Sequence, residues 1–123
     1  MNIYEIIEAD TASFCLANGL IYAPEDPTPD GSDLPERYLL ATMISDPDER
    51  HYSNRRTTTK YRVQFDLVVP KGDADELPDM FEALENALIL AGYLPQGNRR
   101  YRVDEVAQKA YTQKDYYKIM RRG

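Results

Sequence analysis

The feature that most constrains the fold is an alternation of apolar and mostly polar residues over residues 61–69. Successive side chains of a β-strand point to opposite faces, so this period of two predicts a strand with one face in the core. A second strand is predicted at Tyr38–Ser45, where apolar residues continue on both alternating faces. Such a pattern is typical of a strand that is covered on both sides. We therefore expect a β-sheet built around these two segments.

The connector between the two strands is polar, basic and long. It runs over residues 46–60, whereas hairpin loops usually have about two to five residues, so it is either disordered or a pair of strands extended into a projecting arm. The β-branched residues 57–59 fit a pleated strand and lead into Tyr61 without a breaker, which favours the arm and an early start of the second strand. Two interpretations stay open: a solvated hairpin tip, and an arm that docks on a neighbouring subunit.

Length and composition indicate one globular domain over residues 1–123. A chain of 123 residues can bury one core but not two, and 42% hydrophobic with 29% charged residues is ordinary for a folded domain. No apolar run approaches the roughly 20 residues of a membrane span, and no basic start precedes an apolar stretch. We therefore expect neither a membrane span nor a secretion signal, and a protein made and kept in the cytosol.

Charge is segregated along the chain, although its net value is only −6. Residues 1–49 hold eleven acids and one base, whereas residues 50–62 hold five bases and no acid. Residues 73–85 then carry six acids and no base, and residues 99–122 carry eight bases against three acids. These stretches are either solvated faces or opposite patches that suit head-to-tail packing of copies into a ring.

Two helices are predicted. The first covers residues 3–16, with a possible interruption at Asp10 and Thr11. The second begins near Asp75 as its N-cap, has Pro78 in its first turn and ends at Gly92. Its apolar stripe is expected to face the core, and its polar residues off the stripe are expected to be exposed. The stripe comprises Leu77, Met80, Phe81, Leu84, Leu88 and Ala91, and the exposed residues are Glu82, Glu85 and Asn86.

The remaining segments are predicted to be strands, turns and one loop. Residues 20–23 form a short edge strand, and the acidic, proline-rich residues 24–36 form a loop because proline fixes φ and removes donors. Residues 95–98 are predicted to form a turn. Residues 99–106 and residues 111–120 are then predicted to be strands.

No constellation of residues indicates catalysis. There is no glycine-rich phosphate loop, no cluster of metal ligands and no nucleophile–base pair, and the single Cys15 and single His51 fit structural or incidental roles. We therefore expect no enzyme, no cofactor and no metal site. The basic connector with Tyr52 leaves a nucleic-acid-binding module open, since Arg and Lys beside an aromatic residue is the usual composition of such sites.

Several segments resemble the tail terminator, or tail completion, proteins of long-tailed bacteriophages. They are MISD at residues 43–46, RHYSNRR at residues 50–56 and KYRVQFD at residues 60–66. The resemblance continues through the helix that ends in Ala91-Gly92-Tyr93 and the tyrosine-rich strand around Tyr116 and Tyr117. It covers residues 38–121.

The resemblance implies an α/β (α+β) fold with helices packed on one face of a small mixed or antiparallel sheet. It also implies a homohexameric ring that caps the head-proximal end of the tail tube in the virion, stops its polymerisation and joins the head. The implied partners are the tail tube protein and a head-completion or neck protein, with DNA passing through the lumen without specific binding. Alternatives are a head-completion or neck ring and the nucleic-acid-binding module. The residues expected at the subunit or partner interface are Arg50, His51, Tyr52, Asn54, Arg55, Arg56, Lys118, Arg121 and Arg122.

Overall fold

The computed structural model describes residues 3–24, 36–45 and 58–121, which form a small α+β fold, as expected. Residues 25–35 of the loop expected at residues 24–36 lie outside the described residues, and Pro24 belongs to strand β1. Residues 46–57, most of the connector, also lie outside the described residues. None of the described helices is both long and apolar enough to cross a membrane. The elements are, in order, α1 (Ile3–Asn18), β1 (Ile21–Pro24), β2 (Tyr38–Ser45), β3 (Thr58–Pro70), the 3-10 helix η1 (Lys71–Glu76), α2 (Leu77–Leu90), β4 (Tyr93–Asp104) and β5 (Lys109–Arg121).

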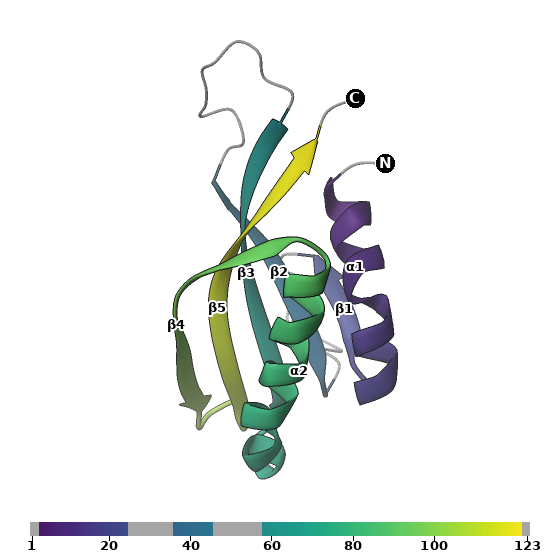
Figure 1. Cartoon of the computed structure of the whole chain (residues 1–123). Coiled ribbons are helices and arrows are strands. Elements are labelled where there is room, and N and C mark those ends of the chain that lie inside the picture. The colour runs from purple at the N-terminus through teal and green to yellow at the C-terminus, as the bar shows by residue number, and fades with distance from the viewer. Residues whose placement is uncertain (1–2, 25–35, 46–57, 122–123) are drawn as a thin grey trace.

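The five strands form one mixed sheet in the order β1-β2-β3-β5-β4. Strands β1 and β2 are parallel, and the other three pairings are antiparallel. Both α-helices lie on the same face of the sheet, in front of it in Figure 1. The described part of the chain is thus a two-layer arrangement with one helix-covered sheet face and one face that no described helix covers.

The core lies between the helices and the covered face. As the alternation predicts, Val63, Phe65, Leu67 and Val69 are fully buried there, and the α2 stripe packs on them. Phe65 contacts the rings of Tyr93 and Tyr116 edge-on, with centroids 5.8 and 5.7 Å away. These contacts join β3, β4 and β5 beneath α2.

Helix α1 is continuous through Asp10 and Thr11, so the helix has no interruption there. The reason is local: the Thr11 hydroxyl donates a hydrogen bond of 2.9 Å to the carbonyl of Ile7 and so is satisfied within the helix. The neighbouring Asp10 carboxylate accepts a hydrogen bond of 2.8 Å from the Tyr93 hydroxyl of β4.

Two expectations for the second helix were wrong. Asp75 lies within η1, so α2 begins only at Leu77, although Pro78 does lie in its first turn. Glu85 is half-buried rather than exposed, because it accepts hydrogen bonds from Lys114 and Tyr116 of β5. Burial alone would raise the pKa of Glu85, but these hydrogen bonds outweigh it and hold the pKa below its usual range.

The predicted turn at residues 95–98 is part of strand β4 instead. The pairing register with β5 shifts between Gln96 and Arg100, and Gly97 has a φ of 75°. Extra residues in one strand and a glycine in the left-handed region are the signature of a β-bulge, which explains why this strand carries turn-like residues. The strand ends at Asp104, earlier than expected. The Asp104 carboxylate accepts hydrogen bonds from the backbone N–H groups of Val106 and Ala107 in the turn that follows.

Candidate assembly interface

Strand β3 continues beyond the rest of the sheet as a two-stranded ribbon. Strand β2 ends opposite Arg62 and β4 begins opposite Lys118, whereas residues 58–60 pair with residues 119–121 of β5. Figure 1 shows these ends of β3 and β5 projecting beyond α2 and β4. The early start of the strand is therefore confirmed. Its partner in the projection is β5, whereas the described part of β2 ends opposite Arg62.

Most of the residues expected at an interface lie outside the described residues. These are Arg50, His51, Tyr52, Asn54, Arg55, Arg56 and Arg122. Arg121 is the last residue of β5, where its backbone lies opposite Thr58 in the ribbon. Of the nine expected residues, the structure therefore describes the surroundings of one side chain, that of Lys118.

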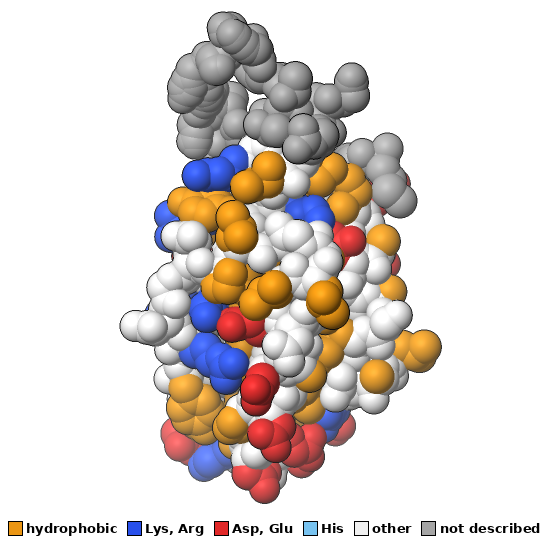
Figure 2. Space-filling model, viewed as in Figure 1, with side chains coloured by type: hydrophobic (Ala, Val, Ile, Leu, Met, Phe, Trp, Pro, Cys, Tyr) orange, Lys and Arg blue, Asp and Glu red, His pale blue; other side chains and the backbone are white. Residues whose placement is uncertain are grey.

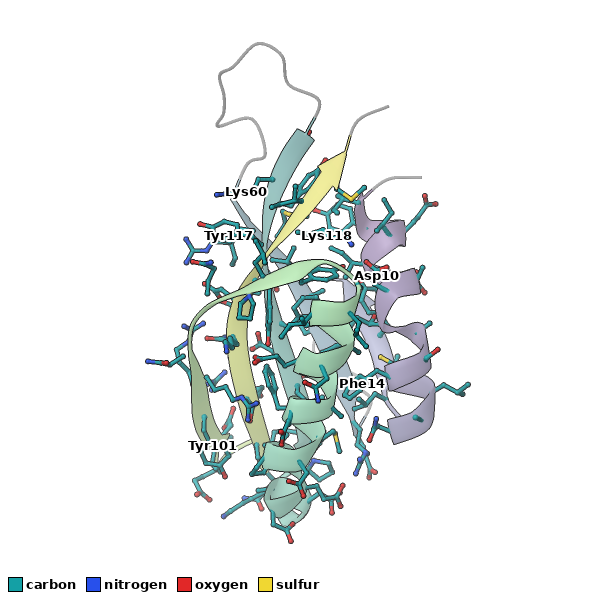
Figure 3. All side chains as sticks on the ribbon, in the orientation of Figure 1. Asp10, Phe14, Lys60, Tyr101, Tyr117 and Lys118 are labelled. Atoms are coloured by element: carbon teal, nitrogen blue, oxygen red, sulfur yellow. The ribbon has the colours of Figure 1, made fainter. Side chains whose placement is uncertain are left out.

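Lys118 is buried and is held by groups of its own chain. Its ammonium donates a hydrogen bond of 2.6 Å to the carbonyl of Ala91, at the end of α2, and lies 3.2 Å from the Asp10 carboxylate of α1. It also lies over the Tyr93 ring, whose hydroxyl donates a 2.8 Å hydrogen bond to the same carboxylate. Figure 3 shows Lys118 and Asp10 facing each other between β5 and α1. In the subunit, Lys118 thus connects both helices to the sheet.

The structure brings together a second set of charged residues, on the sheet face away from the helices. Tyr117 points away from the core because its neighbour Tyr116 is buried in it, and the register places Arg62 opposite Tyr117. The same alternation and pairing place further residues on this side of the sheet, and we call ten of them the helix-free face. They are Lys60, Arg62, Gln64 and Asp66 of β3, Arg100 and Arg102 of β4, and Tyr111, Gln113, Asp115 and Tyr117 of β5.

Asp115 is the centre of an ion-pair network on this face. Its carboxylate is 2.8 Å from the Arg62 guanidinium and 3.1 Å from that of Arg100. Arg100 also donates a 2.8 Å hydrogen bond to the side chain of Gln113. Asp115 is largely buried, whereas both arginine side chains are about half exposed. One carboxylate thus orients two cations whose outer sides face solvent.

Asp66 is buried beside this network, with 5% of its surface exposed. It accepts hydrogen bonds from Gln113 at 3.0 Å and from Gln64 at 3.4 Å, and takes part in no ion pair within the described part of the chain. Burial raises the pKa of Asp66, although those hydrogen bonds and the charges of Arg102 and Arg100 oppose the rise. The Asp66 carboxyl group therefore lies beneath the surface of this face.

Two cations stack on tyrosine rings at the two ends of the face. The Arg102 guanidinium lies 4.1 Å from the centroid of the Tyr111 ring, and the Lys60 ammonium lies 4.3 Å from that of Tyr117. Both cationic side chains are exposed. Because the four basic residues reach the surface and the two acidic ones are buried, the helix-free face is basic in a protein whose net charge is −6.

Sequence reasoning missed this face as a unit. The polar half of the alternation in β3 and the pair Arg100 and Arg102 on alternate positions of β4 were visible signals. Bringing them together required the strand order, because β5 lies between β3 and β4. Sequence spacing alone does not specify which strands are neighbours.

Comparison with known proteins finds no matching family model and no matching curated protein. Within the residues that the structure describes, no group of three or more His, Cys, Asp or Glu side chains could hold a metal ion. The described Cys15 is buried, and burial raises the pKa of its thiol to about 11.

Proposed function

We propose that this chain is a structural subunit of a phage tail, of the tail terminator type. In this role it forms a ring, hexameric in the resembled family, that caps the head-proximal end of the tail tube, stops its polymerisation and provides the head-joining surface. The observation that carries the proposal is the ribbon of β3 and β5, which projects from the sheet. In the sequence, the β3 strand of this ribbon directly follows the basic residues 50–56 and Thr57. A strand pair that leaves its own core is suited to contact a neighbouring subunit.

The proposal is tested by adding the purified protein to polymerising tail tube protein and imaging the tubes by negative stain. We expect length-limited tubes with a ring at one end. Tubes that grow unchecked while the protein remains monomeric and unbound would overturn the proposal. A ring that binds only the head-proximal neck in the same assay would instead favour a head-completion or neck protein.

A second candidate function is nucleic-acid binding, which the basic helix-free face favours. Phosphate contacts by Arg and Lys give an affinity that falls steeply with salt. Filter binding of DNA by two double variants separates the two functions: Arg55→Ala/Arg56→Ala in the connector and Lys60→Ala/Arg102→Ala on the helix-free face. Loss of a salt-sensitive DNA affinity supports the binding module, whereas unchanged DNA retention with loss of tube capping supports the tail subunit.

A further inference from the structure

We infer that the helix-free face of one copy docks on the acidic side of α2 of a second copy. The inference rests on the proposed function in that it specifies which two surfaces join the subunits of the ring. Both surfaces lie within the described residues, so the contact can be argued from their charges and positions.

The acceptor surface is a group of carboxylates on the helix layer. Asp79 and Glu82 are three residues apart on α2 and so are neighbours on one side of it, and Asp75 precedes them in η1. All three are exposed, and in the described part of the chain none of them forms an ion pair. By contrast, the adjacent Asp73 and Glu76 are paired with Arg37. Figure 2, which looks onto the helix layer, shows acidic side chains gathered over η1 and the start of α2.

The two surfaces lie on opposite sides of the subunit. The helices cover one face of the sheet, and Lys60, Arg62, Arg100 and Arg102 reach the surface on the other. A contact between opposite sides of identical copies is heterologous, so it repeats from copy to copy and closes into a ring or continues as a filament. Charge complementarity of this kind orients the partners and raises the rate of association.

Exposed aliphatic side chains accompany the charges on both surfaces. Leu94 and Ile119 lie on the side of the helix-free face, since the register pairs them with Tyr117 and Lys60, and 49% and 44% of their surfaces are exposed. On α2, Ile89 and Leu90 are 47% and 89% exposed. Apolar contact within a ring of ion pairs is the usual composition of a protein interface.

A second copy fits the helix-free face better than a nucleic acid does. Single-stranded nucleic acids bind by stacking bases on aromatic rings. Here Tyr111 and Tyr117 already carry Arg102 and Lys60 over their rings. What the face offers is cations in fixed positions, which match fixed carboxylates on a folded partner.

The test uses charge reversal on each surface and then on both. The face variant is Lys60→Glu/Arg102→Glu, which spares Arg62 and Arg100 because they neutralise the buried Asp115. The helix variant is Asp79→Lys/Glu82→Lys. Its matched control is Glu5→Lys/Glu8→Lys, which makes the same change of charge on exposed positions of α1. Each full-length variant is first checked for a native circular dichroism spectrum.

Association is measured by sedimentation velocity at low and high salt, and by imaging of tail tube ends. We expect each double variant to associate at least about tenfold more weakly than the wild type, and the four-substitution chain to recover to within about threefold. We expect the α1 control to associate like the wild type, and the wild-type contact to weaken with salt because screening shortens the range of the charges.

Folded double variants that associate like the wild type, or a folded four-substitution chain that does not recover, would overturn the inference. Loss of DNA retention in the face variant with unchanged association would overturn it in favour of a nucleic-acid surface. Tubes that remain capped by each double variant on its own would overturn the inference and leave the proposed function intact. Charge-dependent association without any capping would support the inferred contact and overturn the proposed function. A wild type that neither associates nor caps would overturn the inference and the proposed function together.

Discussion

The two faces of the sheet are held by different interactions. On the covered face, side chains such as Phe65 and Phe81 are completely buried and stabilise the fold by removing apolar surface from water. On the helix-free face, Asp115 and Asp66 are buried among strand neighbours and are satisfied by guanidinium and amide groups. A carboxylate can thus be buried by neighbouring strands without a covering helix, provided that their side chains supply hydrogen-bond donors. The cations that do so remain at the surface, where a partner can use them.

The largest expected effect is on the covered face. Phe65→Ala removes a ring that contacts Tyr93 and Tyr116, and we expect it to lower the free energy of unfolding by about 3 to 5 kcal/mol. Urea denaturation monitored by circular dichroism measures this change. A loss below about 1 kcal/mol would show that the covered face is not the main source of stability.

A smaller effect is expected where the helices are joined to the sheet. Lys118→Met keeps the aliphatic stem but leaves the Ala91 carbonyl and the Asp10 carboxylate without their cation, so we expect a loss of about 2 kcal/mol in the same assay. The matched control is Lys60→Met, which changes an exposed lysine on the ribbon. Equal effects at the two positions would contradict the structural role of Lys118.

Asp66→Asn tests the buried carboxylate. Unlike the two preceding substitutions, it is expected to raise the free energy of unfolding. Because burial raises the folded-state pKa of Asp66, the folded state binds the proton more readily than the unfolded state does, and stability from this group falls as pH rises through that pKa. At pH 7 we expect the neutral amide to raise the free energy of unfolding, by a change on the order of 1 kcal/mol.

Thermal unfolding of the wild type and of Asp66→Asn over a range of pH tests whether the substitution stabilises the protein. The gain from Asp66→Asn should shrink as pH falls toward the range in which the wild-type carboxylate takes up its proton. Parallel pH profiles for the two proteins, or a variant that is less stable at pH 7, would contradict the assignment.

The smallest effect on stability is expected at the surface of the helix-free face. Arg102→Ala removes an exposed guanidinium that stacks on Tyr111, so we expect a change below about 1 kcal/mol in the unfolding free energy. We nevertheless expect weaker self-association in sedimentation velocity. A clearly destabilised variant would show that Arg102 stabilises the fold and would contradict its assignment to the contact surface.

Much of the covered face could be predicted from the sequence, because its signal is local. The alternation around Phe65 and the helical stripe through Leu84 specify which side chains are buried without any knowledge of the neighbours. Glu85 shows the limit of that reasoning. It lies at the edge of the stripe, and whether it is exposed depends on Lys114 and Tyr116, which reach it from a strand almost thirty residues later.

The candidate interface depended on information that is not local. The turn-like residues around Gly97 conceal a bulged strand, since glycine and proline serve both purposes. Lys118 is a basic residue in a basic segment, and only the tertiary structure shows that it points to Asp10. Arg62, Arg100 and Asp115 form one network because of the strand order, which the sequence pattern leaves open.

The position of β5 determines when, during synthesis of the chain, the sheet and its helix-free face can be completed. Although β5 follows the other four strands in the chain, it lies between β3 and β4, and it supplies Asp115 and both stacking tyrosines. A nascent chain that has emerged from the ribosome only as far as β4 therefore lacks the strand that closes the sheet. Its cations have no carboxylate at Asp115 to orient them. If the inferred contact joins the subunits, competence to bind neighbouring copies arises only after β5 has been translated.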